Sequence, residues 1–246
     1  RGWGIRDDTF TVFERLSRLG APDWFSLSDR DLATCLYRRQ FLEEGGRQTD
    51  AQAQIATALG VEARVLPMSD APVRTEVLTD AGRRGLQEYL ILDRGELEVR
   101  GVELKGIAEA EPTPEVLAAL RDAEAIVIGP SNPVISIGPI LSVPGMTEAI
   151  LASRAPVVAV SPYVAGEVVK GPTERFMAAV GRPSTAAGVA SLYAGLIDAM
   201  VVDEDDPDPP PEGIPTQAAP TLMDSAAARV RLARIVLDYA AGLDDK

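Results

Sequence analysis

The chain reads AEAIVIGPSNPVISIGPI over residues 123–140, a stretch in which an apolar run leads into a segment rich in proline and serine. Residues 126–128 form a short run of β-branched apolar side chains, which is typical of a strand buried on both faces of a parallel sheet. Gly129 ends the run, and Pro130 and Pro133 then restrict the backbone of the residues around them. The stretch therefore predicts a buried strand that leads directly into a rigid loop.

The rigid loop carries polar groups that suit an anion. Ser131 and Asn132 lie between the two prolines, and we expect their side chains and N–H groups to point outward. Ser136 is a candidate N-cap for a helix that opens at Gly138 and Pro139, and the N–H groups at a helix N-terminus favour anions. The order of strand end, loop and helix start predicts a phosphate site, although a purely structural proline turn would share this sequence.

Strands and helices alternate along the second half of the chain. The expected strands are residues 101–106, 125–129, 155–162 and 199–203, and the expected helices are residues 113–124, 138–153, 171–181, 184–198 and 224–243. Such alternation predicts an α/β fold with a parallel sheet covered on both faces. Ligands then bind at the carboxyl ends of the strands.

A second loop that follows an expected strand resembles the first in its chemistry. Residues 161–172, SPYVAGEVVKGP, contain a serine, prolines and glycines together with Lys170 and Gly171. We expect residues 166–171 to lie beside residues 129–133 on one rim of the sheet. Lys170 has two interpretations, a phosphate contact or an ordinary surface lysine.

The N-terminal quarter reads as helical. We expect helices over residues 7–20, 28–45 and 49–60, with Asp8, Ser28 and Thr49 as their N-caps and Gln52 completing a capping box with Thr49. A β region follows in residues 64–69 and in a hairpin over residues 76–92. The acidic, proline-rich residues 203–213 read as an exposed loop. We place a helical region at 1–62 and the α/β core at 63–246, within a single domain.

The composition excludes several kinds of chemistry. The 246 residues are 46% apolar and carry a net charge of −13 without a basic stripe, which argues against nucleic-acid binding. The chain has no histidine, so a Ser-His-Asp triad, a Cys-His dyad and a histidine-ligated zinc site are excluded within it. Hydroxyls, carboxylates, arginines and backbone amides remain, and these groups suit phosphate and oxygen-ligated Mg²⁺.

Targeting signals and nucleotide fingerprints are missing from the sequence. No apolar run approaches membrane-spanning length and no signal peptide is visible, so we expect a cytoplasmic protein without a membrane partner. The single cysteine, Cys35, fits a reducing compartment. Neither G-x-G-x-x-G after a strand nor the P-loop pattern occurs. Because the chain starts at Arg1 with no preceding strand, we expect an N-terminal truncation.

Several stretches together resemble the 2-phospho-L-lactate transferase family, which includes the phosphoenolpyruvyl transferases of coenzyme F-420 biosynthesis. The resemblance runs in order through RGWGIRDDT (1–9), WFSLSDRDLAT (24–34), GPSNPVISIGPILSVPG (129–145), SPYVAGEVVKGP (161–172) and TLMDS (221–225). The block over residues 129–145 is long and specific. The resemblance therefore covers nearly the whole chain.

The resemblance implies a three-layer Rossmann-like fold and a homodimer. Family members transfer a phospholactyl or phosphoenolpyruvyl group from a guanosine-diphosphate-linked donor to the deazaflavin precursor Fo, and release GMP with the help of Mg²⁺. Family members also begin with a strand, a glycine-rich loop and an N-x-G-D-D segment, which this sequence lacks. We expect the Mg²⁺ ligands to belong to that segment.

Site roles follow from the motif positions. The resemblance implies catalytic roles for Asn132 and Ser131. The expected substrate and nucleotide contacts are Gly129, Pro130, Pro133, Ser136, Ile137, Gly138, Lys170, Gly171, Trp3 and Arg1. Trp3 would border the deazaflavin ring, or it simply packs at a helix entry. Two other functions remain open at this point, a non-catalytic nucleotide-sugar-binding regulator of a related fold and an inactive truncated scaffold.

Overall fold

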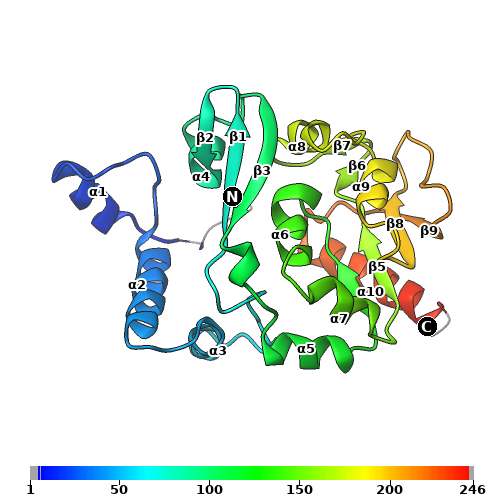
Figure 1. The fold of residues 1–246 in the computed structure, drawn as a ribbon, viewed down its shortest axis with the longest axis horizontal. Coiled ribbons are helices and arrows are strands. Elements are labelled where there is room, and N and C mark those ends of the chain that lie inside the picture. The colour runs from blue at the N-terminus through cyan, green and yellow to red at the C-terminus, as the bar shows by residue number, and fades with distance from the viewer. Residues whose placement is uncertain (1–4, 6, 244–246) are drawn as a thin grey trace. The chain divides into compact units, whose positions relative to one another are not determined.

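The computed structural model describes residue 5 and residues 7–243. The chain divides into two compact units, residues 1–71 and residues 72–246. The described part of the first unit contains the helices α1 (Thr11–Arg18), α2 (Asp29–Glu43) and α3 (Gln48–Ala58) (Figure 1). These three helices confirm the helical prediction for this region.

At the N-termini of α1 and α2, aspartate side chains accept hydrogen bonds from backbone N–H groups. The Asp29 carboxylate accepts the N–H groups of Thr11 at 3.1 Å and Val12 at 3.0 Å, in the first turn of α1. Asp8 instead accepts the N–H of Arg30, at 3.2 Å, in the first turn of α2. The prediction that Asp8 caps the first helix is therefore wrong, because Asp8 accepts an N–H group of the second helix and Asp29 accepts those of the first.

The other two predicted caps of this unit also behave differently. Ser28 does precede α2, but its hydroxyl donates to Asp31 at 2.9 Å and accepts no helix N–H. Helix α3 begins one residue before Thr49, and Thr49 donates both its N–H and its hydroxyl to Asp70 Oδ1 at 2.8 Å. The predicted Thr49–Gln52 capping box is therefore wrong, because a distant carboxylate takes both Thr49 donors.

The second unit starts with a small antiparallel sheet in the order β2-β1-β3, built from β1 (Arg74–Thr79), β2 (Gly82–Gly85) and β3 (Val99–Lys105). The predicted hairpin is right only in its first half, since α4 (Leu86–Ile91) replaces the expected strand. Glu88 accepts the Gly85 N–H at 2.8 Å and so caps this helix. Residues 64–69 form no strand in the described structure, contrary to our prediction.

The second unit also contains a four-stranded sheet in the order β4-β5-β8-β9, in which all neighbours are parallel. Its strands are β4 (Ile126–Ile128), β5 (Val157–Val160), β8 (Ala199–Asp203) and β9 (Thr216–Ala219). The first three confirm predicted strands. Strand β9 was not predicted, because TQAA has little β-propensity and follows a proline-rich loop.

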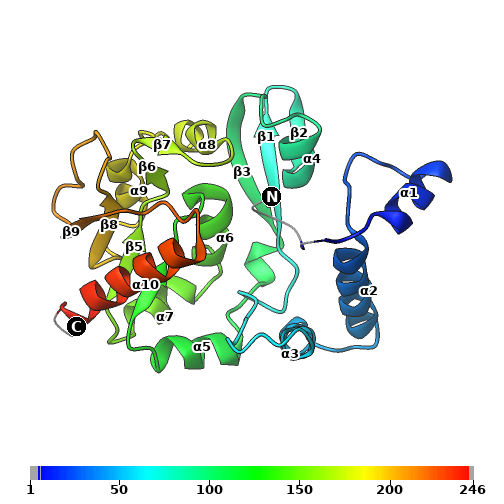
Figure 2. The ribbon, with the colours of Figure 1, turned by 180° about the vertical axis from the view of Figure 1, so that it is seen from behind.

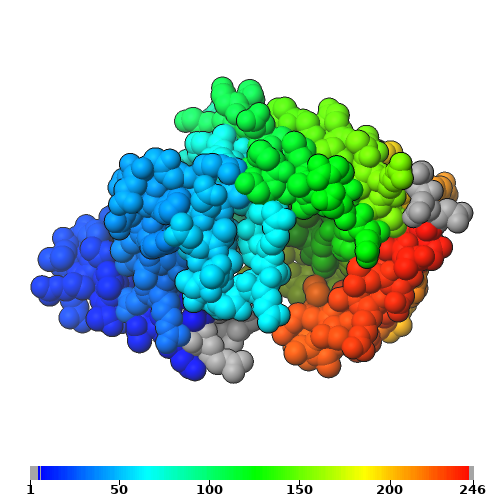
Figure 3. Space-filling view, turned by 90° about the horizontal axis from the view of Figure 1, so that it is seen from below, coloured from blue at the N-terminus to red at the C-terminus, as the bar shows by residue number. Residues whose placement is uncertain are grey.

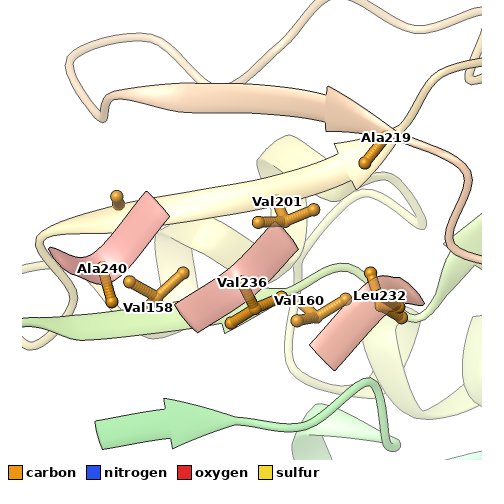
Figure 4. Packing of buried hydrophobic residues seen from close by; sticks show 8 residues of the cluster. Val158, Val160, Val201, Ala219, Leu232, Val236 and Ala240 are labelled. Atoms are coloured by element: carbon orange, nitrogen blue, oxygen red, sulfur yellow. The ribbon is translucent and has the colours of Figure 1, made fainter. Parts of the chain in front are cut away.

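A hydrophobic core lies between this sheet and the C-terminal helix α10 (Ala226–Ala241). Val158, Val160 and Val201 on the sheet pack against Leu232 and Val236 on the helix (Figure 4). Figure 2 shows α10 in front of the sheet. Every residue of β5 and β8 is buried, so both faces of these strands are covered. The predicted α/β fold, a parallel sheet flanked by helices, is confirmed.

Shorter elements connect the strands. They are a 3₁₀ turn (Ile107–Glu109), α5 (Pro114–Arg121), a π-helical turn (Pro133–Ile137), α6 (Gly138–Leu141), α7 (Met146–Leu151), β6 (Tyr163–Val164), β7 (Glu167–Val168), α8 (Thr173–Ala179) and α9 (Ala186–Leu192). The single helix predicted over residues 138–153 is wrong, since Gly145 adopts a φ of 86° and separates α6 from α7. Within the described residues, no helix has the length and apolar character needed to span a bilayer.

The outer side of α10 lies at the surface of the second unit (Figure 3, red). Val230 and Leu237 are exposed on it, whereas Leu232 and Val236 face the sheet. The helix is therefore amphipathic in the way that its sequence predicts.

Candidate functional site at the carboxyl edge of the parallel sheet

A pocket of about 580 Å³ lies where strands of the parallel sheet end. Segments that follow β4, β5 and β9 line it, and α4 adds Leu90. The lining residues in these segments are Pro130, Ser131, Asn132, Ile135 and Ser136; Ser161, Pro162, Val164 and Val168–Thr173; and Thr221, Leu222, Met223 and Asp224. The prediction that residues 129–133 and 166–171 share one rim is confirmed.

Asn132 organises the loop after β4. Its Oδ1 accepts the N–H groups of Val134 at 2.9 Å and Ile135 at 3.0 Å, so Asn132 caps the π-helical turn. Its Nδ2 donates to Thr173 Oγ1 at 3.1 Å, at the start of α8. The prediction that Ser136 is the cap is wrong, because Ser136 lies inside the turn that Asn132 caps.

Several backbone N–H groups of this loop bind acceptors within the loop itself. Ser131 donates its N–H to Gly129 O at 2.8 Å, and both Ser136 and Ile137 donate to Asn132 O at 3.1 Å. The prediction of a free N–H group is therefore wrong for Ser131, because this group is bonded inside the loop.

Several predicted site residues lie next to the lining without belonging to it. Gly129, Pro133, Ile137 and Gly138 are in the same loop but outside the set of described residues that line the pocket. A Cβ on Gly138 would lie 3.0 Å from Pro133 O, so glycine allows the close passage from the π-helical turn into α6. Gly138 shapes the loop, and a ligand contact is not required to explain it.

The loop after β5 brings Lys170 to the pocket by way of the β6–β7 hairpin. The two turn residues of that hairpin, Ala165 and Gly166, have φ values of 50° and 79°, as a type I′ turn requires. The chain then passes through Lys170 and through Gly171, whose φ is 85°. Lys170 and Gly171 both line the pocket, and their contact with a substrate stays a prediction.

Asp203, at the end of β8, joins two of the loops that line the pocket. Its Oδ1 accepts the Ala165 N–H at 3.0 Å, and its Oδ2 accepts both the N–H of Thr221 at 2.9 Å and the Thr221 hydroxyl at 2.6 Å. Burial acts to raise the pKa of this carboxyl, but the hydrogen bonds from Thr221, Ala165 and Asp205 outweigh burial and lower the pKa below its usual value.

This role of Asp203 was not predicted, because we expected an exposed acidic loop to begin at this residue. Asp203 is only 5% exposed, whereas Glu204 and Asp205, which follow it, are exposed. The usable signal was its position as the last residue of the buried run AMVVD, at the carboxyl end of a parallel strand.

The third lining segment, after β9, adds a carboxylate. Asp224 lines the pocket together with Leu222 and Met223, and Ser225 behind it caps α10 by accepting the Ala228 N–H at 3.1 Å. The site prediction omitted this segment, although TLMDS carried part of the family resemblance. The pocket therefore has one lysine and one carboxylate among its described lining residues.

The remaining site predictions concern the N-terminus and the metal. Arg1 and Trp3 lie outside the described residues. Among the residues that the structure describes, no group of three or more histidine, cysteine, aspartate or glutamate side chains is arranged to hold a metal ion. The expected use of Mg²⁺ therefore stays a prediction.

Comparisons with known proteins show sequence similarity over most of the chain. A family model described as 2-phospho-L-lactate transferase CofD matches residues 7–237. A 2-phospho-L-lactate transferase of Methanosarcina mazei is 41% identical over 241 residues, which cover 96% of this chain and 79% of that protein. A phosphoenolpyruvate transferase of Streptomyces griseus is 40% identical over 250 residues, which cover 98% of this chain and 79% of that protein.

A solved structure shows the same fold. It is a member of the UPF0052 family from Bacillus halodurans, with a TM-score of 0.60 and 19% sequence identity, and the match covers 85% of this chain and 72% of that one. At this identity the likeness concerns the fold alone. The extent of the family match and the identity to its members decide the assignment: the chain belongs to the 2-phospho-L-lactate transferase family and is a transferase.

Proposed function

We propose that this transferase moves a 2-phospholactyl or phosphoenolpyruvyl group from a guanosine-diphosphate-linked donor to the primary hydroxyl of the deazaflavin precursor Fo, in coenzyme F-420 biosynthesis. The supporting observation is the pocket that three strand-end segments form around Ser131, Lys170 and Asp224. It combines hydroxyl, cationic and carboxylate groups at the edge where parallel sheets bind ligands. Relatives named 2-phospho-L-lactate transferase and relatives named phosphoenolpyruvate transferase both match almost the whole chain.

The proposed reaction is a displacement at phosphorus. The Fo hydroxyl oxygen attacks the phosphorus that bears the lactyl or enolpyruvyl group, and a new O–P bond forms. The bond from that phosphorus to the bridging oxygen breaks, and GMP leaves with the electron pair. The hydroxyl proton passes to a carboxylate or to water. Such a reaction needs alignment and charge neutralisation more than a covalent nucleophile, so a chain without histidine can perform it.

Pocket residues match these needs. Lys170 offsets negative charge on the phosphate oxygens, and the exposed Ser131 hydroxyl donates to one of them. Asp224 accepts the proton of the attacking hydroxyl, because it is the carboxylate among the described lining residues.

Asn132 takes a positioning role in this proposal instead of contacting the reacting atoms. Its amide group already binds Val134, Ile135 and Thr173. It therefore holds the loop that carries Ser131 in place against the start of α8.

The direct test is a turnover assay with purified protein, Fo and each of the two guanosine-diphosphate-linked donors. We expect GMP and the phospholactyl or phosphoenolpyruvyl product in equal amounts, and competition between the donors shows which one is preferred. Calorimetry with GDP and with a UDP-sugar provides the contrast. Tight binding of the UDP-sugar without turnover of Fo would reject the proposed function.

We also propose that the active enzyme is a homodimer. Light scattering coupled to size-exclusion chromatography measures the mass directly, and a 26.1 kDa species that is fully active would contradict it.

A further inference from the structure

Strand β8 stands between β5 and β9 in the sheet, but its own residues are absent from the described pocket lining. The segments that follow its two neighbours do line the pocket. Building on the function proposed above, we propose that Asp203 at the end of β8 is a positioning residue. It holds the β6–β7 hairpin and the segment Thr221–Asp224 at the separation at which they bind the donor.

The hydrogen bonds of Asp203 match an ionised carboxylate. Oδ1 accepts the N–H groups of Ala165 at 3.0 Å and Asp205 at 3.3 Å, and Oδ2 accepts two donors from Thr221. An ionised carboxylate has about four acceptor sites and no donor, so four incoming N–H and O–H groups satisfy it. An asparagine would direct its own NH₂ group toward two of these donors.

The Ala165 contact holds a strained turn. Ala165 has a φ of 50°, a left-handed conformation that residues with a Cβ rarely adopt. Its N–H bond to Asp203 compensates for this strain. The turn is also tightly confined, since a Cβ on Gly166 would lie 2.8 Å from Pro207 Cδ. The hairpin therefore depends on Asp203 for its conformation.

Both segments tied by Asp203 continue directly into the pocket. The hairpin leads through Val168 and Val169 to Lys170, and Thr221 begins the segment that ends at Asp224. A change at Asp203 therefore moves the lysine side and the carboxylate side of the pocket relative to each other.

The test compares Asp203→Asn with the wild type and with Asp205→Asn. Asp205 is exposed, so its substitution removes the same charge from the same loop without touching the two ties. We expect Asp203→Asn to raise the KM for the donor about tenfold, because the NH₂ group of asparagine cannot accept the hydrogen bonds that one carboxylate oxygen accepted, and the segments loosen. Asp205→Asn should leave KM within about twofold, as surface substitutions usually do.

Two further variants separate positioning from general stability. Thr221→Val removes one donor and should raise KM about threefold, since a single hydrogen bond is lost. Ala165→Gly placed in the Asp203→Asn background should recover part of the KM, because glycine adopts a φ of 50° without help from the carboxylate. If Asp203→Asn does not fold, Thr221→Val alone decides.

The KM of the Asp203→Asn enzyme for the donor separates a positioning role from a merely structural one. An unchanged KM in a folded Asp203→Asn enzyme, with only the active fraction reduced, shows a merely structural role and overturns the inference. If the wild type turns over no donor, the proposed function fails, and amide exchange of residues 163–171 and 221–224 with GDP as the probe decides the inference. Equal protection of both segments by GDP in wild type and Asp203→Asn would then overturn it.

Discussion

Asn132 Nδ2 donates a hydrogen bond of 3.1 Å to Thr173 Oγ1, a residue 41 positions further along the chain. Thr173 is buried at the start of α8, and Asn132 caps the π-helical turn after β4. This bond joins two of the three segments that line the pocket. Asp203 joins the second to the third. The pocket is thus held together by two side chains that each bind across separate loops.

Replacement of Asn132 by alanine should lower kcat/KM about a hundredfold, because the loop that carries Ser131 loses its fixed position. It should also destabilise the protein by about 1 kcal/mol through loss of the cap. Asn132→Asp is the matched variant, since a carboxylate still accepts the Val134 N–H and accepts from the Thr173 hydroxyl. Steady-state kinetics and urea unfolding measure both effects, and equal activity of the alanine variant and the wild type would contradict the positioning role.

Loss of the Lys170 charge should weaken donor binding. We expect Lys170→Gln to raise the donor KM about tenfold, because a charge-assisted contact to phosphate is removed. Lys105→Gln is the control, since Lys105 lies on β3 outside the pocket lining. Calorimetry with GDP should show the same difference. Identical GDP affinities for the two variants would place Lys170 outside the phosphate site.

Asp224 should matter for the chemical step more than for donor binding. We expect Asp224→Asn to lower kcat about a hundredfold with little change in the donor KM, as removal of a general base does. Asp238→Asn, on the exposed part of α10, removes the same charge and should be neutral. A large rise in KM without a fall in kcat would assign Asp224 to binding instead.

The stability that Asp203 contributes should depend on pH. Its pKa in the folded state lies below the value of about 3.9 that an unfolded chain has, so its contribution is complete above that value. The contribution is lost as the pH falls through the folded-state pKa. The difference in unfolding free energy between wild type and Asp203→Asn should therefore be largest near neutral pH and shrink in acid. Urea unfolding at several pH values tests this, and a difference that grows in acid would be inconsistent with it.

We also propose that the enzyme uses Mg²⁺, as the family resemblance implies, so removal of divalent cations should abolish turnover. Displacement at phosphorus builds negative charge on the oxygens, and a cation is the usual means of offsetting it. The assay is Fo turnover with EDTA, followed by addition of excess Mg²⁺. Recovery is the expected result, and full activity in EDTA would reject the metal requirement.

Local patterns in the sequence predicted much of this fold. The β-branched runs at residues 126–128 and 157–160 have few alternatives to buried parallel strands, and both are strands. The two loops that follow them were expected to share a rim, because strands of one parallel sheet end at the same edge. The family resemblance predicted that the protein is a transferase.

Other features depended on partners far away in the chain. Thr49 and Ser136 both stand at positions typical of a helix cap. In the structure, however, Thr49 donates to Asp70, and Asn132 caps the turn that contains Ser136. TQAA becomes β9 only because β8 offers it a partner. Secondary structure set by nearby residues can be read from the sequence, whereas a side chain's hydrogen-bond partner can be read only once the fold is known.

Asp203 shows this division most clearly. As one of several acidic residues in DEDDPDPPP it resembles its exposed neighbours, and the sequence alone determined only that a polar, proline-rich loop begins there. The tertiary structure decided that Asp203 is the one whose carboxylate meets Ala165 and Thr221. The physical reason is that a buried carboxylate is stable only where donors converge on it, and these donors come from segments 38 and 18 residues away.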